Sequence, residues 1–297
     1  MAPILSLLSS PDWQDYELLD SGDSLRLEKI GKYVVVRPEF QAVWKPRMSQ
    51  KAWKNVDAIF QPTAEESGGH WNYLRPMESA WKMSYKSLAF YARTSASRHI
   101  GFFPEQAAHW DWIRERIISA NRPINVLNLF GYTGLASLAA AQAGAKVTHV
   151  DASKKSVAQA QENQLLAGLE HKPIRWIVDD ALKFVRREQH RGVVYDGLIL
   201  DPPKFGRGPK GEVWEFFQAL PVLLGECRQI LGKNPLFVVI TAYAIRASAL
   251  SLYYSVEEMM GNQDGSLEAG ELVLQEKSGT RLLSMAIFAR WQARKTP

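Results

Sequence analysis

The sequence predicts an α/β fold: a doubly wound, mostly parallel sheet that is closed by an antiparallel C-terminal hairpin and preceded by a small β-rich module. Two observations lead to this fold class. From residue 124 onward, apolar strand-like runs alternate with helical stretches, which is the pattern of βαβ units in a parallel sheet. Near the end of the chain, only residues 277–280 separate two apolar runs, and so short a connection joins antiparallel strands.

Seven strands are expected in this sheet, which belongs to a predicted domain of residues 96–297. The parallel strands are predicted near residues 124–130, 146–151, 174–178, 195–201 and 235–241. The helices are predicted near residues 133–143, 153–167, 181–190, 213–231 and 245–260. The closing hairpin is predicted to pair residues 271–276 with residues 282–291.

Residues 1–95 are predicted to form the separate β-rich module. Residues 24–44 alternate between apolar and polar side chains, and Gly31 with Lys32 predicts a tight hairpin there. Further strands are expected at 58–60, 71–74 and 88–91, with a polar loop at 61–70. Five tryptophans of this module are expected to pack in its core, although they also suit stacking on nucleic-acid bases. They are Trp13, Trp44, Trp53, Trp71 and Trp81.

Composition narrows the class of protein. With 46% hydrophobic and 23% charged residues the chain reads as globular, and it has no run of about 20 apolar residues that would predict a membrane span. The first ten residues carry no Lys or Arg, so no secretory signal is predicted. One cysteine, Cys227, excludes an internal disulfide and suits a reducing cytoplasm, and the histidine spacing predicts no metal site. The net charge of +5 is compatible with a nucleic-acid partner.

A glycine turn follows the first strand of the predicted sheet. It comprises residues Phe130 to Gly134, in which Gly131 and Gly134 form a G-x-x-G motif. Asp151 ends the next predicted strand, about 20 residues later. An acid at that place suits a pair of ribose hydroxyls. Because the pyrophosphate fingerprint of dinucleotide-binding proteins is incomplete, a nucleoside cofactor without a pyrophosphate fits better. We expect S-adenosylmethionine, with S-adenosylhomocysteine as its product.

The second motif, Asp201-Pro202-Pro203-Lys204-Phe205, directly follows the apolar run at 197–200. Prolines fix the backbone, so the turn holds the Asp201 carboxylate and the neighbouring carbonyls in set directions. It lies where open α/β sheets bind ligands, at the carboxyl ends of the strands. We expect this turn to bind a planar target that carries an amine. The alternative is that it only ends the strand.

A glycine-rich basic stretch, residues 204–211, comes next. Arg207 and Lys210 are predicted to meet phosphate groups of a large substrate. The alternative is a solvated loop tip.

These motifs, in this order, resemble the class I S-adenosylmethionine-dependent methyltransferases. Within that class the chain is similar to the large-subunit ribosomal RNA methyltransferase group that includes 5-methylcytosine and 7-methylguanine enzymes. The resemblance covers about residues 100–297 and is strongest in a bacterial branch that carries Phe-Pro-Glu-Gln-Ala-Ala-His-Trp-Asp-Trp, here residues 103–112. It implies the methyltransferase variant of the sheet and ribosomal RNA as partner.

The resemblance also implies roles for individual residues. Asn128 and the Phe130, Gly131, Tyr132, Thr133, Gly134 turn would cradle the methionine part of the cofactor. Asp151 would hold the ribose, and Ala152 and Ser153 would flank the adenine, whose amine would donate to Asp180 beside Ala181. Phe103, Glu105 and Gln106 stand where related enzymes have a cofactor contact, but the arginine that often follows is Ala107 here. An N-cap is the alternative role of Asp180, and the two roles are compatible.

One departure bears on the chemistry. The 5-methylcytosine enzymes use a cysteine nucleophile placed after the fifth strand, where this chain has Thr241-Ala242-Tyr243. Cys227 lies in a predicted helix among Leu223, Leu224 and Ile230, as an inert buried thiol would. The sequence therefore favours methylation of a base nitrogen. The alternatives are a methyltransferase of the same fold acting on a small molecule or protein, and an RNA-binding module without catalysis.

Overall fold

A computed structural model of the chain describes residues 3–63 and 68–294, and the chain divides into two compact units. The first unit comprises Met1–Leu8, Ala108–Leu272 and Ala286–Pro297, and the second comprises Ser9–Ala107 and Val273–Met285. The chain thus changes unit at residues 107 and 108, and the tip of the C-terminal hairpin belongs to the second unit. The division into domains 1–95 and 96–297 stays a prediction.

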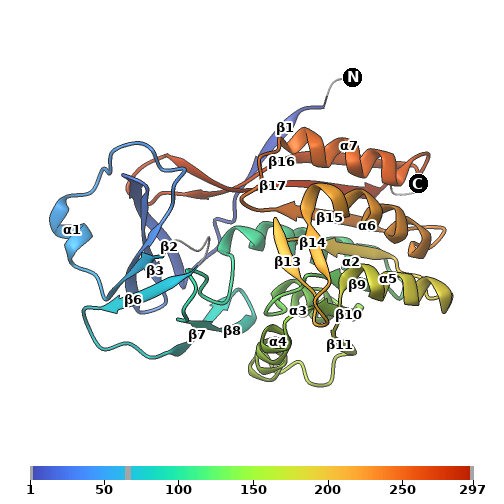
Figure 1. Cartoon of the computed structure of the whole chain (residues 1–297), viewed down its shortest axis with the longest axis horizontal. Coiled ribbons are helices and arrows are strands. Elements are labelled where there is room, and N and C mark those ends of the chain that lie inside the picture. The colour runs from blue at the N-terminus through green and yellow to red at the C-terminus, as the bar shows by residue number, and fades with distance from the viewer. Residues whose placement is uncertain (1–2, 64–67, 295–297) are drawn as a thin grey trace. The chain divides into compact units, whose positions relative to one another are not determined.

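The first unit is built on one eight-stranded sheet with the order β1-β16-β17-β15-β12-β9-β10-β11 (Figure 1). Its central strands are parallel, and β17 runs antiparallel to β15. The fold class is therefore confirmed, and β1, which pairs with β16, adds a strand to the predicted seven. The strands are β1 (Leu5–Leu8), β9 (Asn125–Leu129), β10 (Lys146–Asp151), β11 (Ile174–Val178), β12 (Gly197–Leu200), β15 (Phe237–Ala242), β16 (Gly265–Gln275) and β17 (Leu282–Ala293).

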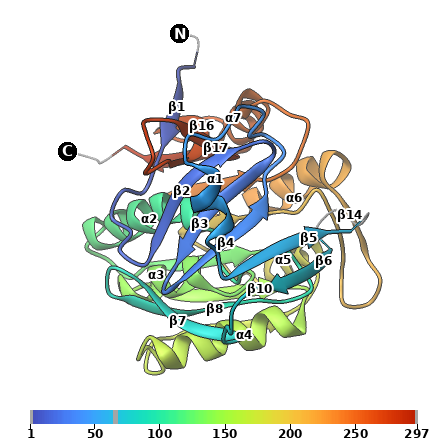
Figure 2. The same cartoon turned by 90° about the vertical axis from the view of Figure 1, so that its left-hand side faces the viewer.

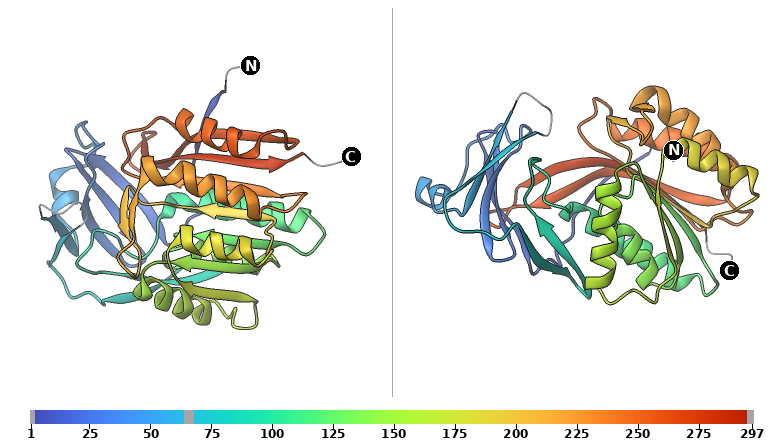
Figure 3. Two further views of the ribbon diagram at one scale, coloured as in Figure 1. Left: turned by 45° about the vertical axis from the view of Figure 1, so that its right-hand side comes forward. Right: turned by 60° about the horizontal axis from the view of Figure 1, so that its bottom comes forward.

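Helices cover both faces of this sheet (Figure 3). They are α2 (Ala107–Ser119), α3 (Leu135–Gln142), α4 (Lys154–Leu166), α5 (Ala181–His190), α6 (Phe216–Ile230) and α7 (Ala249–Met260). Helices α5, α6 and α7 share one core cluster with Leu127, Leu198 and Val238 of the strands. On the opposite face, α2 and α3 pack with Val126 and Ile199. Since both faces are covered, the central strands are mostly buried and rich in apolar residues, as parallel strands generally are.

The second unit contains a five-stranded sheet, β2-β3-β4-β5-β6, and a separate pair, β7-β8 (Figure 2). The predicted hairpin at Gly31 and Lys32 is confirmed, because it joins β3 to β4. The predicted loop at 61–70 is shorter, since β5 ends and β6 begins within it, and its residues 64–67 lie outside the described residues. The elements are β2 (Tyr16–Gly22), β3 (Leu25–Ile30), β4 (Tyr33–Pro38), α1 (Gln50–Lys54), β5 (Ala58–Pro62), β6 (Gly69–Tyr73), β7 (Ala80–Tyr85), β8 (Leu88–Arg93) and the 3₁₀ helix η1 (Pro104–Gln106).

The tryptophans of the second unit pack within it, as predicted. Trp71 and Trp81 are buried, and Trp13 lies against Tyr85 with ring centroids 4.6 Å apart. Trp44 and Trp53, which like Trp13 are half-buried, have hydrogen-bond partners in this unit: the indole N–H of Trp44 donates to Ser21 and that of Trp53 to Asp20. These contacts make core packing, rather than base stacking, their role.

Among the helices of the described ranges, none combines the length and apolar character that crossing a bilayer needs. Within the same ranges, no group of three or more His, Cys, Asp or Glu side chains is placed to hold a metal ion.

Candidate active site

The predicted motifs of the first unit meet at the carboxyl ends of adjacent parallel strands. Strand β9 lies between β10 and β12 in the sheet, so the segments that follow these three strands are neighbours. Together with the end of β11 they enclose a recess of about 60 Å³. The lining residues are Phe130, Val150, Asp151, Ala152, Asp179, Asp180, Ala181, Pro203, Gly206, Arg207, Gly208 and Trp214.

The glycine turn after β9 holds an unusual backbone conformation. Phe130 and Tyr132 have φ angles of 57° and 50°, in the left-handed region that non-glycine residues rarely adopt. Gly134 has φ 86°, and a Cβ on Gly131 would lie 2.4 Å from Cε1 of His149. Both glycines are therefore required, one by backbone angle and one by close approach.

Asp151 ties this turn to the end of β10. Its Oδ2 accepts from the backbone N–H of Tyr132 and its Oδ1 from that of Ser153, each at 2.8 Å. Burial raises the pKa of Asp151, and the two backbone donors oppose that effect. Two donors leave lone pairs on the carboxylate, which accommodates about four hydrogen bonds. The carboxylate is thus fixed in direction and retains acceptor capacity for hydroxyl groups.

Asp180 and Ser153 both cap helices. Asp180 Oδ1 accepts from the backbone N–H of Lys183 at 2.9 Å at the start of α5, and Ser153 Oγ accepts from Ser156 at 3.2 Å at the start of α4. The N-cap role predicted for Asp180 is confirmed. Since Asp180 also lines the recess, the cap fixes the carboxylate beside the space where an adenine amine is predicted to lie.

Asn128 lies beneath the glycine turn rather than in the recess. Its side chain is buried and donates to Ser137 Oγ at 2.9 Å, and that hydroxyl lies 3.0 Å from Nδ1 of His149. Thr133 is also buried, and its carbonyl accepts from Asn163. The hydrogen bond of the Asn128 side chain is therefore internal, and a direct part in cofactor binding stays a prediction.

The Asp-Pro-Pro turn is anchored at both ends. The Asp201 N–H donates to the carbonyl of Leu129 at 3.4 Å, and the N–H of Phe216 donates to the carbonyl of Lys204 at 3.1 Å. Between them, the indole N–H of Trp214 donates to the carbonyl of Pro203 at 2.6 Å. Trp214 is not among the predicted site residues, because the sequence pattern places it at the start of the helix predicted near residues 213–231.

The basic stretch that follows is a β-hairpin rather than a loop. Strand β13 (Phe205–Arg207) pairs antiparallel with β14 (Val213–Glu215), and Gly208 donates to the carbonyl of Glu212 at 2.8 Å. The predicted helix start at 213 was therefore wrong by three residues. Arg207 lines the recess beside Asp151 and Asp180, whereas Lys210 is exposed at the tip.

Phe103, Glu105 and Gln106 belong to the second unit. Glu105 and Gln106 form η1, Glu105 is buried, and the Phe103 ring lies 5.2 Å from that of His99. Their predicted contact with the cofactor stays a prediction.

Cys227 is fully buried in α6 within the main core cluster, and burial raises the pKa of its thiol well above the ordinary value. The predicted burial of Cys227 in a core helix is confirmed, and its inertness stays a prediction. A thiol that stays protonated and inaccessible cannot act as a nucleophile.

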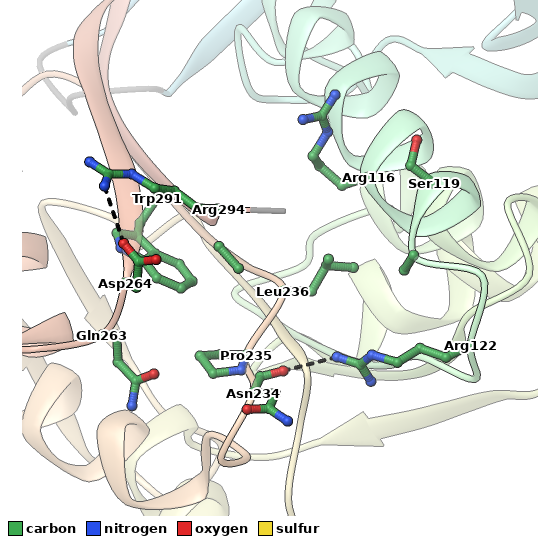
Figure 4. A pocket seen from close by; sticks show the side chains of 12 residues that line it. Arg116, Ser119, Arg122, Asn234, Pro235, Leu236, Gln263, Asp264, Trp291 and Arg294 are labelled. Atoms are coloured by element: carbon green, nitrogen blue, oxygen red, sulfur yellow. Dashed lines mark hydrogen bonds and ion pairs between the residues drawn. The ribbon is translucent and has the colours of Figure 1, made fainter. Parts of the chain in front are cut away.

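A larger hollow of about 610 Å³ lies at the opposite, amino end of the strands (Figure 4). None of the predicted site residues lines it, and several of its polar groups pair with one another. Arg122 donates to the carbonyl of Asn234 at 2.9 Å, and Arg294 lies 3.4 Å from Asp264. Figure 4 shows both guanidinium groups directed at these partners.

A doubly wound sheet closed by an antiparallel hairpin, with a glycine turn and acids at the carboxyl ends of its strands, defines the class of nucleoside-cofactor methyltransferases. A family model described as S-adenosylmethionine-dependent methyltransferase matches residues 48–245. The chain belongs to that family.

Three comparisons refine this placement. A crystal structure of an S-adenosylmethionine-dependent methyltransferase from Agrobacterium tumefaciens shares 48% identity and a TM-score of 0.94, covering 98% of this chain and 94% of that one. Ribosomal RNA large subunit methyltransferase I of Aeromonas salmonicida (strain A449) is 29% identical over 178 residues, which are 57% of this chain and 40% of the relative. Ribosomal RNA large subunit methyltransferase K/L of Shewanella frigidimarina (strain NCIMB 400) is 37% identical over 112 residues, 37% of this chain and 15% of the relative. The matches thus span less than half the length of both curated relatives.

Proposed function

We propose that this protein methylates a base nitrogen of ribosomal RNA with S-adenosylmethionine as methyl donor. The observation that carries the proposal is the Asp201–Phe205 turn, fastened at the carboxyl end of β12 directly beside the glycine turn of β9. In this proposal the arrangement brings Asp201, as an acceptor for the target, next to the predicted cofactor residues.

The residues of the recess fit the nucleoside part of the cofactor. Asp151 has acceptor capacity for ribose hydroxyls, and Asp180 for an amine. Ala152 and Ala181 place small side chains on the wall, which leaves room for a flat ring. The recess of about 60 Å³ is smaller than the roughly 300–1,000 Å³ of whole ligand sites, so it would hold only one edge of the molecule.

When bound, S-adenosylmethionine supplies a methyl carbon attached to a sulfonium, which is a good leaving group. The chain then has to orient a nitrogen lone pair in line with that methyl carbon, and positioning of this kind accounts for much of a catalytic effect. Asp201 would accept from an N–H of the target base and so set the direction of the lone pair. Phe205, whose ring is 53% exposed, would stack on the base.

The burial of Cys227 supports a nitrogen atom as the methylated target. Methylation of a pyrimidine carbon needs a covalent nucleophile, and Cys227 is buried in α6 away from any surface. Ribosomal RNA as the substrate is supported by the names of the relatives and by the basic hairpin that carries Arg207 and Lys210. A cytoplasmic location follows from that substrate.

Tritiated S-adenosylmethionine offered with total RNA, ribosomal subunits and a metabolite extract tests the proposal. We expect label in ribosomal RNA, supplied either as free RNA or as subunits. Label found only in metabolites or in protein would contradict RNA as the substrate and would favour a small molecule or a protein instead.

A further inference from the structure

The hairpin β13–β14 has two unlike faces. Residues directly opposite each other in an antiparallel pair point to the same side of the sheet. The register therefore places Gly206 and Trp214 on one face, and Phe205, Arg207, Val213 and Glu215 on the other. Trp214 is only 5% exposed, whereas Phe205 and Val213 are 53% and 63% exposed. The hairpin thus turns an apolar surface toward solvent beside the Asp201 turn.

The charges of this hairpin are unevenly satisfied. Glu212 pairs with Lys183 and also accepts from the backbone of Lys210, and Glu215 caps α6 by accepting from Gln218. Within residues 3–63 and 68–294, by contrast, the side chains of Arg207 and Lys210 have no acidic partner. The outward face consequently combines exposed apolar groups with two unpaired cations.

This combination fits a polyanion that exposes flat apolar groups. In a duplex the faces of the bases are stacked on one another, and only edges and backbone meet a protein. In a single strand the base faces are open to side chains while the phosphates remain open to cations. A two-fold pairing of this face with itself would bring like charges together, which disfavours a second copy of the chain as occupant.

We propose that the outward face of the hairpin, Phe205, Arg207 and Val213 with Lys210 at the tip, binds a single-stranded RNA segment. The protein then takes its target nucleotide from an unpaired region. This inference rests on the proposed function and specifies the form of its RNA substrate.

Fluorescence anisotropy of the full chain tests this with a labelled, unstructured RNA oligonucleotide and with the same strand annealed to its complement. We expect the single strand to bind roughly tenfold more tightly, as stacking on base faces would give. Val213→Ser should lower single-strand affinity about threefold, and Val213→Asp about tenfold, because the first removes apolar contact and the second adds a negative charge near phosphates. Val194→Ser, at a valine of similar exposure that precedes β12, is the matched control and should bind as wild type. Unchanged affinity for S-adenosylhomocysteine shows that each variant is folded.

Equal affinity for duplex and single strand, or wild-type affinity in both Val213 variants, overturns the inference. If ribosomal RNA is nevertheless methylated, the proposed function stands without it. Single-strand preference and weakened Val213 variants without methylation of any RNA would support single-strand binding by the hairpin face, and would overturn the proposed function together with the statement about the target nucleotide. A dimer in sedimentation that Val213→Asp dissociates would assign the face to a second copy and overturn the inference.

Discussion

The indole N–H of Trp214 donates to the carbonyl of Pro203 at 2.6 Å, while its ring lies 4.8 Å from that of Phe130. One side chain thereby connects the Asp-Pro-Pro turn of β12 with the glycine turn of β9. The two turns carry the predicted target and cofactor residues. We therefore expect Trp214 to help hold the two turns at a fixed distance from each other.

Trp214→Phe should slow methyl transfer more than it destabilises the fold. Phenylalanine keeps an aromatic ring against Phe130 but loses the bond to Pro203, which contributes about 1 kcal/mol to stability. The change should appear mainly in kcat, because the turn loses its fixed position. Urea unfolding and steady-state kinetics measure the two effects. Trp112→Phe on α2 serves as the control, and an equal loss of kcat in both variants would contradict the positioning role of Trp214.

Asp151→Ala should weaken binding of S-adenosylmethionine and S-adenosylhomocysteine by roughly 1.5–3 kcal/mol, the range for hydrogen bonds to a charged group. Isothermal titration calorimetry measures this, and NAD should not bind. Asp264→Ala removes an exposed carboxylate at the amino end of the sheet and should have no effect. Unchanged affinity in Asp151→Ala would remove Asp151 from the cofactor site.

Much of this site was predictable from sequence because its signals are local. The run at 197–200 is apolar since both faces of β12 are covered, and Asp180 marks the start of α5 because its side chain caps the helix. The contribution of Trp214 was not predictable. Strands β13 and β14 have three residues each, and the glycines around them read as a loop.

Other contacts depend on residues far apart in the chain. The cofactor role of Asn128 stays a prediction, and its hydrogen bond to Ser137 could not be predicted because that bond depends on how α3 packs under the turn. Strand β1 pairs with β16 across more than 260 residues, from Leu5 to Ala269, and its exposed Leu5 and Leu7 give no periodic signal. Tertiary pairing of this kind leaves no trace in a local pattern.

Lys210→Ala should reduce the log–log salt dependence of RNA binding by up to about one unit and leave cofactor affinity unchanged. Lys210 is the cleaner test of phosphate contact because Arg207 also lines the recess beside Asp151. Arg207→Ala is expected to weaken the binding of both RNA and cofactor. Lys233→Ala, an exposed lysine before β15, is the control for net charge. An unaltered salt slope in Lys210→Ala would mean that the hairpin tip is merely solvated.

His109 should make unfolding sensitive to acid. Burial lowers its pKa to about 3, so the folded protein keeps it neutral while the unfolded chain protonates it near pH 6.5. Below pH 6.5 the unfolded state then binds one more proton at His109, and this residue alone lowers stability by about 1.4 kcal/mol per pH unit until pH nears 3.

Urea unfolding of the wild type and of His109→Leu between pH 7 and pH 4 tests this. The free energy of unfolding of the variant should depend less steeply on pH, by the contribution of one proton. His171→Leu, at an exposed histidine, should match wild type. A slope that His109→Leu leaves unaltered would mean that the imidazole is charged in the folded protein.

The identity of the methylated nucleoside tests the central claim most directly. Ribosomal RNA is incubated with the protein and S-adenosylmethionine that carries a deuterated methyl group, then digested to nucleosides and analysed by mass spectrometry. We predict a deuterated methyl on a base nitrogen, retained within a few-fold in Cys227→Ser and lost in Asp201→Ala. A deuterated methyl on a pyrimidine carbon, with a 5-fluorocytosine RNA trapped covalently on Cys227, would contradict the account.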